Sequence, residues 1–322
     1  MSKKVIITDT DFGSIDLEKI VLKDIAEVIL ADTKRVEELT NIVADADGLI
    51  VQYAPINEVV INNMKKCKVI SRTGVGFDNV DVQAASKRGI YVCNVTNYCS
   101  NEVADHVMAM LLALHRKLFK LNNSVRNNEW DIRIAKPILG LNETTLGIVG
   151  LGNIGRNLAR KARAFNINII AYDPYMEEKD LTENWISLCG FEELIKKSDF
   201  ISLNLSLTNE TKHMFSREEF KKMKSTAIII NAARGGLIDF DALLEALESG
   251  QIAGAGLDVL EKEPPELDKT FCADNLIITP HGAFYSENSI KTLRTEAAKN
   301  VARILKGEKA INVVNDKLDL KR

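Results

Sequence analysis

Short apolar runs alternate with longer amphipathic segments along almost the whole chain. The short runs are rich in Val, Ile and Leu and are continuous rather than alternating, which is typical of strands buried on both faces of a sheet. We expect strands at 5–8, 48–52, 68–71, 90–93, 146–150, 168–172, 200–204, 227–231, 253–257 and 276–279. Helical patterns fit between them at 36–43, 82–86, 154–165, 191–197 and 241–249. This rhythm predicts parallel sheets covered by helices.

Two longer helical patterns, at 101–126 and 287–306, interrupt the rhythm. Ser100 is a suitable N-cap for the first, and Gly307 ends the second. We therefore predict an α/β fold with two doubly wound parallel-sheet domains, Rossmann-like or flavodoxin-like, joined by two long helices and with the active site in the cleft. The outer domain would comprise 1–100 plus 295–322, and the inner domain 101–294.

Composition and charge narrow the function classes. The 322 residues carry a net charge of −3, and no long basic stretch is present, so nucleic-acid binding through bulk charge is not indicated. The longest apolar run, at 107–114, is far shorter than the roughly 20 residues of a membrane-spanning helix, and no signal-peptide core follows Met1. We expect a cytoplasmic protein without a membrane partner.

The cysteines are odd in number and show no CxxC spacing, which favours free thiols in a reducing compartment. They are Cys67, Cys93, Cys99, Cys189 and Cys272. The four histidines are not spaced with them as a ligand set, so we expect no metal site.

A glycine-rich turn lies between the strand expected at 146–150 and the following helix. Gly150, Gly152 and Gly155 form a complete G-x-G-x-x-G. In this motif the first glycine allows the tight turn, the second lets the backbone approach a pyrophosphate, and the third lets the helix pack against the strand. The helix N-terminus adds N–H groups and the positive end of its dipole. Such turns also occur without a ligand, but here the expected strand–turn–helix context is present.

An acidic residue at the end of the next strand narrows the dinucleotide to NAD. Asp173 follows the strand at 168–172, where a carboxylate accepts hydrogen bonds from the adenosine ribose and would repel the 2′-phosphate of NADP. The alternative is a solvated turn residue before Pro174.

Three more polar loops follow consecutive strands. The strand at 227–231 runs into Arg234, the strand at 253–257 into Asp258, Glu261 and Glu263, and the strand at 276–279 into His281. Ligands bind at the carboxyl ends of strands in doubly wound sheets, so we expect these side chains at one sheet edge. Each of these residues alone is more often structural or exposed to solvent. Their occurrence on consecutive strand ends is stronger evidence for a functional site than any one of them.

Together these residue types suit hydride transfer to or from a nicotinamide. Oxidation of a secondary alcohol needs a base for the hydroxyl proton, and His is the natural choice near neutral pH. A carboxylate beside it favours the protonated imidazole, which suits a proton donor in the reducing direction. An Arg can bind the carboxylate of an acid substrate and polarise its keto oxygen.

The chain resembles the D-isomer-specific 2-hydroxyacid dehydrogenase family over nearly its whole length. The resemblance rests on the ordered motifs at 147–155, 231–236, 257–259 with Glu263-Pro264, and Pro280-His281. It implies that Arg234 binds substrate, that Glu263 pairs with the base and that His281 transfers the proton. It also implies NAD-dependent interconversion of a 2-oxo acid and its D-2-hydroxy acid.

The resemblance implies two sets of binding residues. Those at the cofactor are Val75, Gly150, Gly152, Asn153, Ile154, Gly155, Asp173, Leu205, Ser206, Thr211, Ala232, Ala233, Arg234, Asp258, His281 and Gly282. Those at the substrate are Tyr53, Arg72, Val75, Gly76, Arg234, His281 and Phe284. Asp258 would hold the nicotinamide carboxamide, and the backbone N–H groups of Val75 and Gly76 would receive the substrate carboxylate. The alternative for the segment around Val75 is an ordinary glycine-rich βα turn.

Several stretches, among them 172–175 and 280–287, resemble the C-terminal-binding-protein branch of the family. Phe284 stands where that branch carries a tryptophan, and Asn204 and Ser206 depart from the wider family's His-x-Pro-Leu-Thr pattern. Two alternatives therefore accompany the dehydrogenase hypothesis: an NAD(H)-sensing protein-binding scaffold, and phosphoglycerate dehydrogenase. We expect neither an extended tail nor a further regulatory domain after the last helix, which weighs against both.

The helix at 101–126 and the loop at 127–139 resemble the family's dimer-forming region, so we expect a homodimer. The apolar side chains of Val103, Val107, Met110 and Leu111 fit such an interface, but they could equally belong to an ordinary core.

We predict that the enzyme prefers NADH to NADPH, because the Asp173 carboxylate would repel the 2′-phosphate. The measurement is kcat/KM for each cofactor with the same substrate. Equal or better turnover with NADPH would refute the role given to Asp173.

Overall fold

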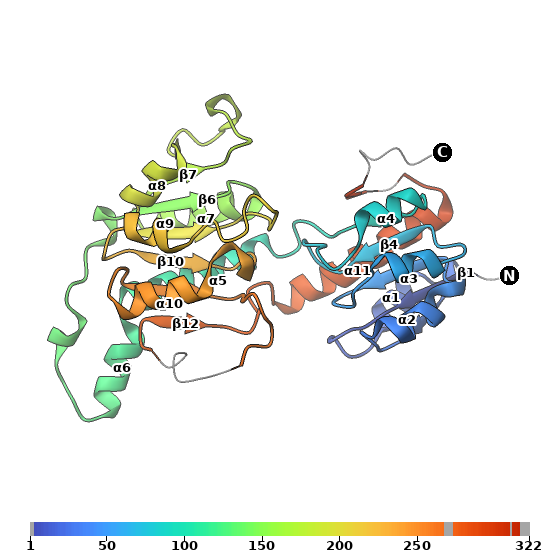
Figure 1. Cartoon of the computed structure of the whole chain (residues 1–322), viewed down its shortest axis with the longest axis horizontal. Helices are drawn as coiled ribbons and strands as arrows, with labels where there is room; N and C mark the ends of the chain where they lie inside the picture. Colours follow the sequence, from blue (N-terminus) through green and yellow to red (C-terminus); the bar gives the residue numbers. More distant parts are fainter. Residues whose placement is uncertain (1–2, 267–272, 310, 316–322) are drawn as a thin grey trace. The chain divides into compact units, whose positions relative to one another are not determined.

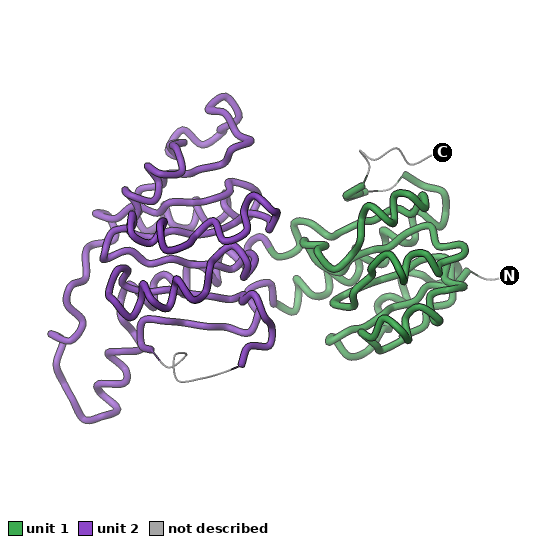
Figure 2. Tube along the Cα trace, viewed as in Figure 1, with its two compact units in different colours: residues 1–99, 286–322 green, residues 100–285 purple. Residues whose placement is uncertain are grey.

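The computed structural model describes residues 3–266, 273–309 and 311–315, and the chain forms two compact units (Figures 1 and 2). Unit 1 comprises Met1–Cys99 and Ser286–Arg322, and unit 2 comprises Ser100–Tyr285. The chain enters unit 2 at the start of the long helix α5 (Ser100–His115) and returns to unit 1 before α11 (Glu287–Lys306). The predicted fold class, two parallel-sheet α/β domains joined at two long helices, is confirmed.

Unit 1 is built on a five-stranded parallel sheet in the order β2-β1-β3-β4-β5. Its elements are β1 (Lys3–Ile7), α1 (Asp16–Val21), β2 (Ala26–Leu30), α2 (Val36–Ile42), β3 (Gly48–Val51), α3 (Glu58–Asn63), β4 (Val69–Arg72), α4 (Val82–Lys87), β5 (Tyr91–Cys93) and α11. Neighbouring side chains of β1 enter different cores: Ile6 packs with α2, α3 and α4, whereas Val5 and Ile7 pack with α11. Helices on both faces explain why the strands read as continuous apolar runs.

Helix α11 belongs to unit 1 along its whole length. Leu293 and Ala297 lie in the core with Val5, and Arg294 forms a buried ion pair with Glu18 of α1, with 2.7 Å between Nη2 and Oε2. The boundary between the units therefore lies at Ser286, whereas the sequence analysis placed it at 295. The sequence pattern shows that α11 has an apolar side but not which sheet this side packs against. In the structure it packs against the sheet of unit 1, so the whole helix belongs to that unit.

Unit 2 is built on a seven-stranded parallel sheet in the order β12-β11-β10-β9-β6-β7-β8. Its elements are α5, α6 (Leu118–Arg126), β6 (Thr145–Val149), α7 (Asn153–Ala164), β7 (Asn168–Tyr172), β8 (Ser187–Leu188), α8 (Phe191–Lys197), β9 (Phe200–Leu203), α9 (Arg217–Lys222), β10 (Ile228–Asn231), α10 (Phe240–Glu248), β11 (Gly254–Leu257) and β12 (Leu276–Ile278). The strand order reverses between β6 and β9, and doubly wound sheets bind ligands at such a reversal. Helix α5 packs against α7, β10 and β11, while α9 packs against both α8 and α10.

Some elements differ from those expected. The edge strands β2 and β8 and the short helices α1, α3 and α9 were not predicted, because they are short or only partly buried. The helix expected at 101–126 is broken: α5 ends at His115 and α6 begins at Leu118. Lys117 lies between them in the left-handed conformation, with φ of 51°.

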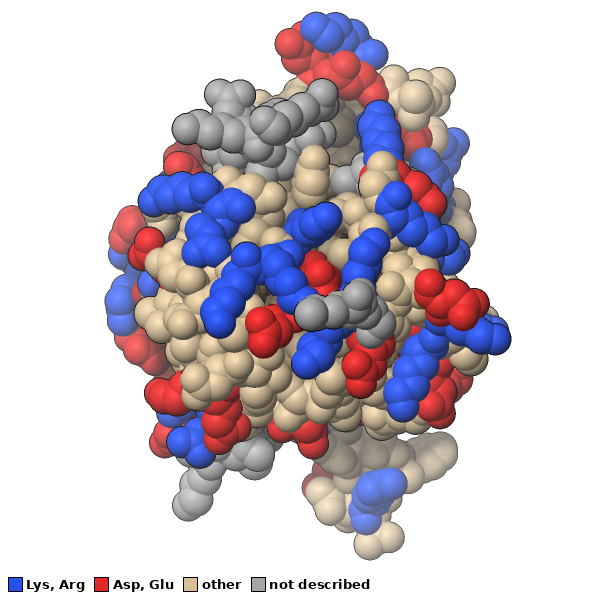
Figure 3. Space-filling model, turned by 90° about the vertical axis from the view of Figure 1, so that its right-hand side faces the viewer, with Lys and Arg blue, Asp and Glu red and all other residues tan. Residues whose placement is uncertain are grey.

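Charged side chains of both signs are interspersed on the face of the molecule drawn in Figure 3. On the face drawn in Figure 3, lysine and arginine side chains lie across the middle, with aspartate and glutamate among and around them. None of the helices in the described ranges is long and apolar enough to cross a membrane.

Among the described residues, Cys67, Cys93, Cys99 and Cys189 form no disulfide, and Cys272 lies outside the described residues. Burial raises the pKa of the Cys67 and Cys93 thiols to about 12, so both are protonated near neutral pH. Within the same described ranges, no three His, Cys, Asp or Glu side chains form a group suited to a metal ion.

Candidate active site

The loops that carry the predicted catalytic residues leave one edge of the unit 2 sheet. Arg234 follows β10, Glu263 follows β11 and His281 follows β12, and these strands are neighbours in parallel register. Because parallel strands all end at the same edge, residues far apart in the chain converge there.

His281 and Glu263 form a hydrogen-bonded pair at this edge. His281 Nδ1 lies 2.7 Å from Glu263 Oε2, and the other carboxylate oxygen accepts the backbone N–H of Leu260 at 2.9 Å. An ionised carboxylate only accepts hydrogen bonds, so Nδ1 carries a proton in this pair. Nε2 is then the ring nitrogen left to exchange a proton with a substrate.

Glu263 is stabilised as a carboxylate. Partial burial raises its pKa, but the hydrogen bonds from His281 and the Leu260 N–H, with the nearby charge of His281 and Arg234, outweigh burial. The net result is a pKa below the usual value for glutamate, so Glu263 remains ionised near neutral pH.

The loop of Arg234 is fixed by two residues that the sequence analysis did not assign to the site. The buried Asn231 donates from Nδ2 to the Arg234 carbonyl at 2.8 Å and accepts the Ala233 N–H at 3.0 Å. At Gly235 a Cβ would lie 2.0 Å from the carbonyl carbon of Leu260, so only glycine lets the two backbones approach this closely. The Arg234 loop thus packs directly on the loop that leads to Glu263.

The loop of His281 is held by Asp258. His281 has φ of 52°, and its N–H donates to the carbonyls of Asp258 at 2.8 Å and Thr279 at 2.9 Å. The buried Asp258 carboxylate accepts the N–H groups of Gly282 at 2.8 Å and Ala283 at 2.9 Å. A left-handed conformation costs a residue with a Cβ about 1–2 kcal/mol, and these bonds hold His281 in it. The nicotinamide contact expected of Asp258 stays a prediction.

Phe284 lies beside the pair. Its ring is perpendicular to the imidazole of His281, with 6.2 Å between the centroids. This places an apolar ring next to the imidazole, and the substrate contact expected of Phe284 stays a prediction.

The glycine turn fits a dinucleotide. Gly150 has φ of 92°, and a Cβ at Gly155 would lie 2.3 Å from the Gly150 carbonyl oxygen, so both positions need glycine for the turn itself. At Gly152, the N-cap of α7, no atom lies within 4 Å of where a Cβ would be. The fold does not require glycine at 152, whereas a pyrophosphate approaching the helix N-terminus would.

Asp173 borders this turn. Its two carboxylate oxygens accept the backbone N–H groups of Leu151 and Tyr175, each at 3.0 Å. Each oxygen keeps a further lone pair, so the carboxylate can still accept hydrogen bonds from ribose hydroxyls.

The segment expected to line the nicotinamide side also reaches the glycine turn. The Asn204 carbonyl lies 2.8 Å from the Cβ position of Gly150. Thr211 Oγ1 donates to the Ser206 carbonyl at 2.8 Å and accepts the Thr208 N–H at 2.7 Å, which fixes the loop after Leu205. The other predicted cofactor residues of unit 2, Asn153, Ile154, Ala232, Ala233 and Gly282, lie on the loops described above or in the first turn of α7.

In unit 1, the predicted substrate residues lie at strand ends of its own sheet. The buried Asp9 accepts the N–H groups of Tyr53 at 2.8 Å and Ala54 at 3.1 Å, which positions the turn after β3. Asn94 Nδ2 donates to the Val75 carbonyl at 2.6 Å. Neither Asp9 nor Asn94 was singled out from the sequence, because each acts through the backbone of another loop.

The Val75 loop presents its residues at the surface of unit 1. Arg72 Nη1 donates to the Thr73 carbonyl at 3.0 Å, and the Val75 side chain is exposed. Gly76 follows on the same loop, between the exposed side chains of Val75 and Phe77.

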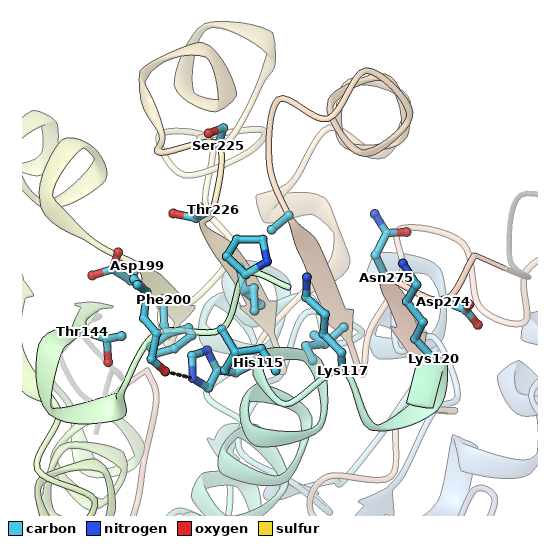
Figure 4. A pocket seen from close by; sticks show the side chains of 16 residues that line it. His115, Lys117, Lys120, Thr144, Asp199, Phe200, Ser225, Thr226, Asp274 and Asn275 are labelled. Carbon is cyan, nitrogen blue, oxygen red and sulfur yellow. Dashed lines mark hydrogen bonds between the residues drawn. The ribbon is translucent and has the colours of Figure 1, made fainter. Parts of the chain in front are cut away.

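A cavity of about 460 Å³ in unit 2 lies at the opposite edge of the sheet (Figure 4). Its lining includes Phe200 and Ile228, which begin β9 and β10, and Asn275, which precedes β12, together with His115 and Lys117. Because the loops of Arg234, Glu263 and His281 leave the carboxyl edge, this cavity is not the candidate active site.

Comparison with known proteins shows similarity to one family of dehydrogenases. The NAD binding domain of the family described as D-isomer specific 2-hydroxyacid dehydrogenase matches residues 108–283. D-3-phosphoglycerate dehydrogenase of Methanocaldococcus jannaschii is 42% identical over 92% of this chain, which spans 56% of that relative. Glyoxylate reductase of Thermococcus litoralis is 37% identical over 89% of this chain and 86% of its own length.

A solved structure agrees with these matches. D-lactate dehydrogenase from Aquifex aeolicus, complexed with NAD and lactic acid, superposes with a TM-score of 0.86 at 32% identity, covering 94% of this chain and 96% of its own. The similarities support the family as a whole and do not single out the C-terminal-binding-protein branch.

Two glycine variants test the cofactor turn. Gly155→Ala should lower the melting temperature, because its Cβ would clash with the Gly150 carbonyl. Gly152→Ala should leave the melting temperature within about 2 °C, because space is open there, but should weaken NADH binding about ten-fold or more. Thermal unfolding and NADH fluorescence titration measure the two effects. If a folded Gly152→Ala variant kept the wild-type affinity for NADH, the prediction that the pyrophosphate binds at this turn would be wrong.

Proposed function

The chain belongs to the D-isomer specific 2-hydroxyacid dehydrogenase family, and on that premise we propose that it interconverts a small 2-oxo acid and the corresponding D-2-hydroxy acid. The expected family and cofactor are confirmed: residues 108–283 match the family's NAD binding domain, and a structural neighbour is complexed with NAD. The enzyme class is that of an NAD-dependent oxidoreductase.

The observation that carries the proposal is the His281–Glu263 pair with the Arg234 loop packed beside it. In the reducing direction, protonated His281 would donate from Nε2 to the oxo oxygen, which becomes the hydroxyl. When bound, NADH supplies the hydride that reaches the carbonyl carbon. Glu263 keeps the imidazole oriented and favours its protonated form, and Arg234 binds the substrate carboxylate and polarises the oxo group.

We assign the two units different tasks. Unit 2 would bind NAD through the turn at Gly150–Gly155 and the Asp173 carboxylate. Unit 1 would receive the substrate carboxylate on the N–H groups of Val75 and Gly76, with Tyr53 and Arg72 contributing to substrate selection. These roles follow from the family motifs and from the exposed position of the Val75 loop.

A phosphorylated substrate is the second candidate. The 42% identity to a D-3-phosphoglycerate dehydrogenase favours it, and the 37% identity to a glyoxylate reductase favours a small unphosphorylated acid. A panel of glyoxylate, hydroxypyruvate, pyruvate, a branched 2-oxo acid and 3-phosphohydroxypyruvate separates the two.

We predict NADH-dependent reduction of at least one member of this panel, and loss of that activity in His281→Ala. Removal of a general acid lowers kcat by about 100- to 10,000-fold, while the Kd for NADH should remain within about two-fold. Absorbance at the NADH band gives kcat, and fluorescence titration gives the Kd.

His213→Ala is the matched control. His213 also pairs with a glutamate, Glu261, at 3.1 Å, but it lies outside the proposed machinery and should keep wild-type kcat. Retained activity in His281→Ala would disprove the proton-transfer role, and no turnover by the wild type with any panel member would disprove the proposed reaction.

We further propose a homodimer that forms through an arm of unit 2. Val103, Val107, Met110 and Leu111 are buried inside the unit, so they form ordinary core. The segment 118–139, however, projects from unit 2 (Figure 1) and exposes large apolar side chains. They are Leu118, Phe119, Val125, Trp130, Ile132 and Leu139, with Trp130 90% exposed. Apolar groups gathered in this way are typical of a protein–protein interface.

Light scattering should give a mass twice the 35.8 kDa of one chain. Trp130→Glu should shift the mass toward that of a single chain, because it places a charge in the proposed interface. Tyr175→Glu, which alters another almost fully exposed aromatic residue, should not. A monomeric wild type at micromolar concentration would exclude the dimer.

A further inference from the structure

His281 owes its position to the Asp258 carboxylate, which accepts three hydrogen bonds from the loop after β12. Asp258 Oδ1 accepts the Gly282 N–H at 2.8 Å and the Thr279 hydroxyl at 2.6 Å, and Oδ2 accepts the Ala283 N–H at 2.9 Å. The carboxylate is buried. Its orientation therefore decides where the backbone after His281 lies.

The Thr279 hydroxyl connects this carboxylate to a histidine on α5. Thr279 Oγ1 lies 2.9 Å from His106 Nε2, and the same His106 nitrogen lies 3.7 Å from Asp258 Oδ1. A hydroxyl has one proton, and at 2.6 Å that proton is directed to the carboxylate, since two oxygens at this distance without a proton between them would repel. His106 must then donate from Nε2, which identifies the nitrogen that carries its proton.

Helix α5 gives this network a rigid support. Met110, one helical turn after His106, packs against the glycine strand β11 at Gly256. The helix itself packs on α7, β10 and β11. The chain of hydrogen bonds from His106 through Thr279 to Asp258 thus ties the loop of His281 to the centre of unit 2.

We propose that His106 and Thr279 are positioning residues for proton transfer: they act through Asp258 and set the place of the His281 imidazole. The proposal rests on the proposed function, because it assigns His281 to the reaction. The new proposal goes beyond the proposed function because it attributes part of the rate to two side chains, His106 and Thr279, that act through Asp258 and the backbone.

The main test is Thr279→Val, which removes the hydroxyl and keeps the branched shape. A small displacement of a reacting group can cost up to about 100-fold in rate, so kcat should fall about ten-fold or more, while KM for NADH should stay within about two-fold. His106→Leu should have a similar effect. The double variant His106→Leu/Thr279→Val should be no slower than the slower single variant, because both act through one chain of bonds.

Conservative variants and a control separate positioning from simple destabilisation. Thr279→Ser restores the hydroxyl and His106→Gln can restore a donor, so each should recover most of the lost kcat. His115→Leu removes a histidine from the same helix at the opposite sheet edge and should keep wild-type kcat. Melting temperatures identify any variant that fails to fold. If the His106 variants do not fold, the kcat of Thr279→Val alone tests the proposal.

A readout that needs no turnover is available because the chain has four histidines. Imidazole nitrogen NMR of protein labelled at histidine should show a proton on Nε2 of His106, and the His281 signals should shift in Thr279→Val. Unchanged His281 signals with wild-type kcat, a loss confined to KM for NADH, or additive losses in the double variant would each overturn the proposal. An inactive wild type in which the His281 signals still shift would sink the proposed function alone.

Discussion

Every strand of the two sheets runs in the same direction as its neighbours, and the site depends on that constraint. Parallel strands need crossover helices, and helices on both faces leave a polar group little access to solvent except at the strand ends. Polar residues that follow consecutive strands therefore meet at one edge. Arg234, Glu263 and His281 converge for this reason, although 47 residues (281 − 234) separate the first from the last.

This geometry also explains which parts of the molecule could be predicted from the sequence. Buried strands are continuous apolar runs, and the glycine turn and the residues after β10, β11 and β12 are local patterns, so the sheets, the cofactor turn and the meeting of an Arg, an acid and a His at one edge were expected. That Glu263 is the acid paired with His281 was implied by the family resemblance. Edge strand β2 carries a short apolar run at 28–30, but it is only partly buried and was not predicted. The break at Lys117 lies inside an unbroken helical pattern, since nothing in the composition of that segment marks a left-handed residue.

The residues that the sequence analysis missed support the site indirectly. Asn231, Asp9 and Asn94 hold backbone groups of the loops that carry the expected side chains, and Gly235 allows two loops to touch. Asp9 and Asp258 use the same device in different units: a buried carboxylate just after a strand accepts successive N–H groups from a neighbouring strand-end loop. Apart from Asn231, which bonds within its own loop, these contacts join residues far apart in the chain. His106 and Thr279 are 173 positions apart, and a single sequence has no local signal for such a contact.

Two glycines of strand β11, Gly254 and Gly256, leave room for helix α5 to pack on the sheet. At Gly256 a methyl group would lie 3.2 Å from Met110 of α5 and 2.8 Å from Ile230 of β10, and at Gly254 it would approach Leu114. Because Gly254 and Gly256 carry no side chain, α5 can pack close to the backbone of this strand. A single added carbon at Gly256 would force Ile230 or Met110 to shift, so the close packing of α5, the helix that carries His106, depends on a strand whose glycines contribute no side chain.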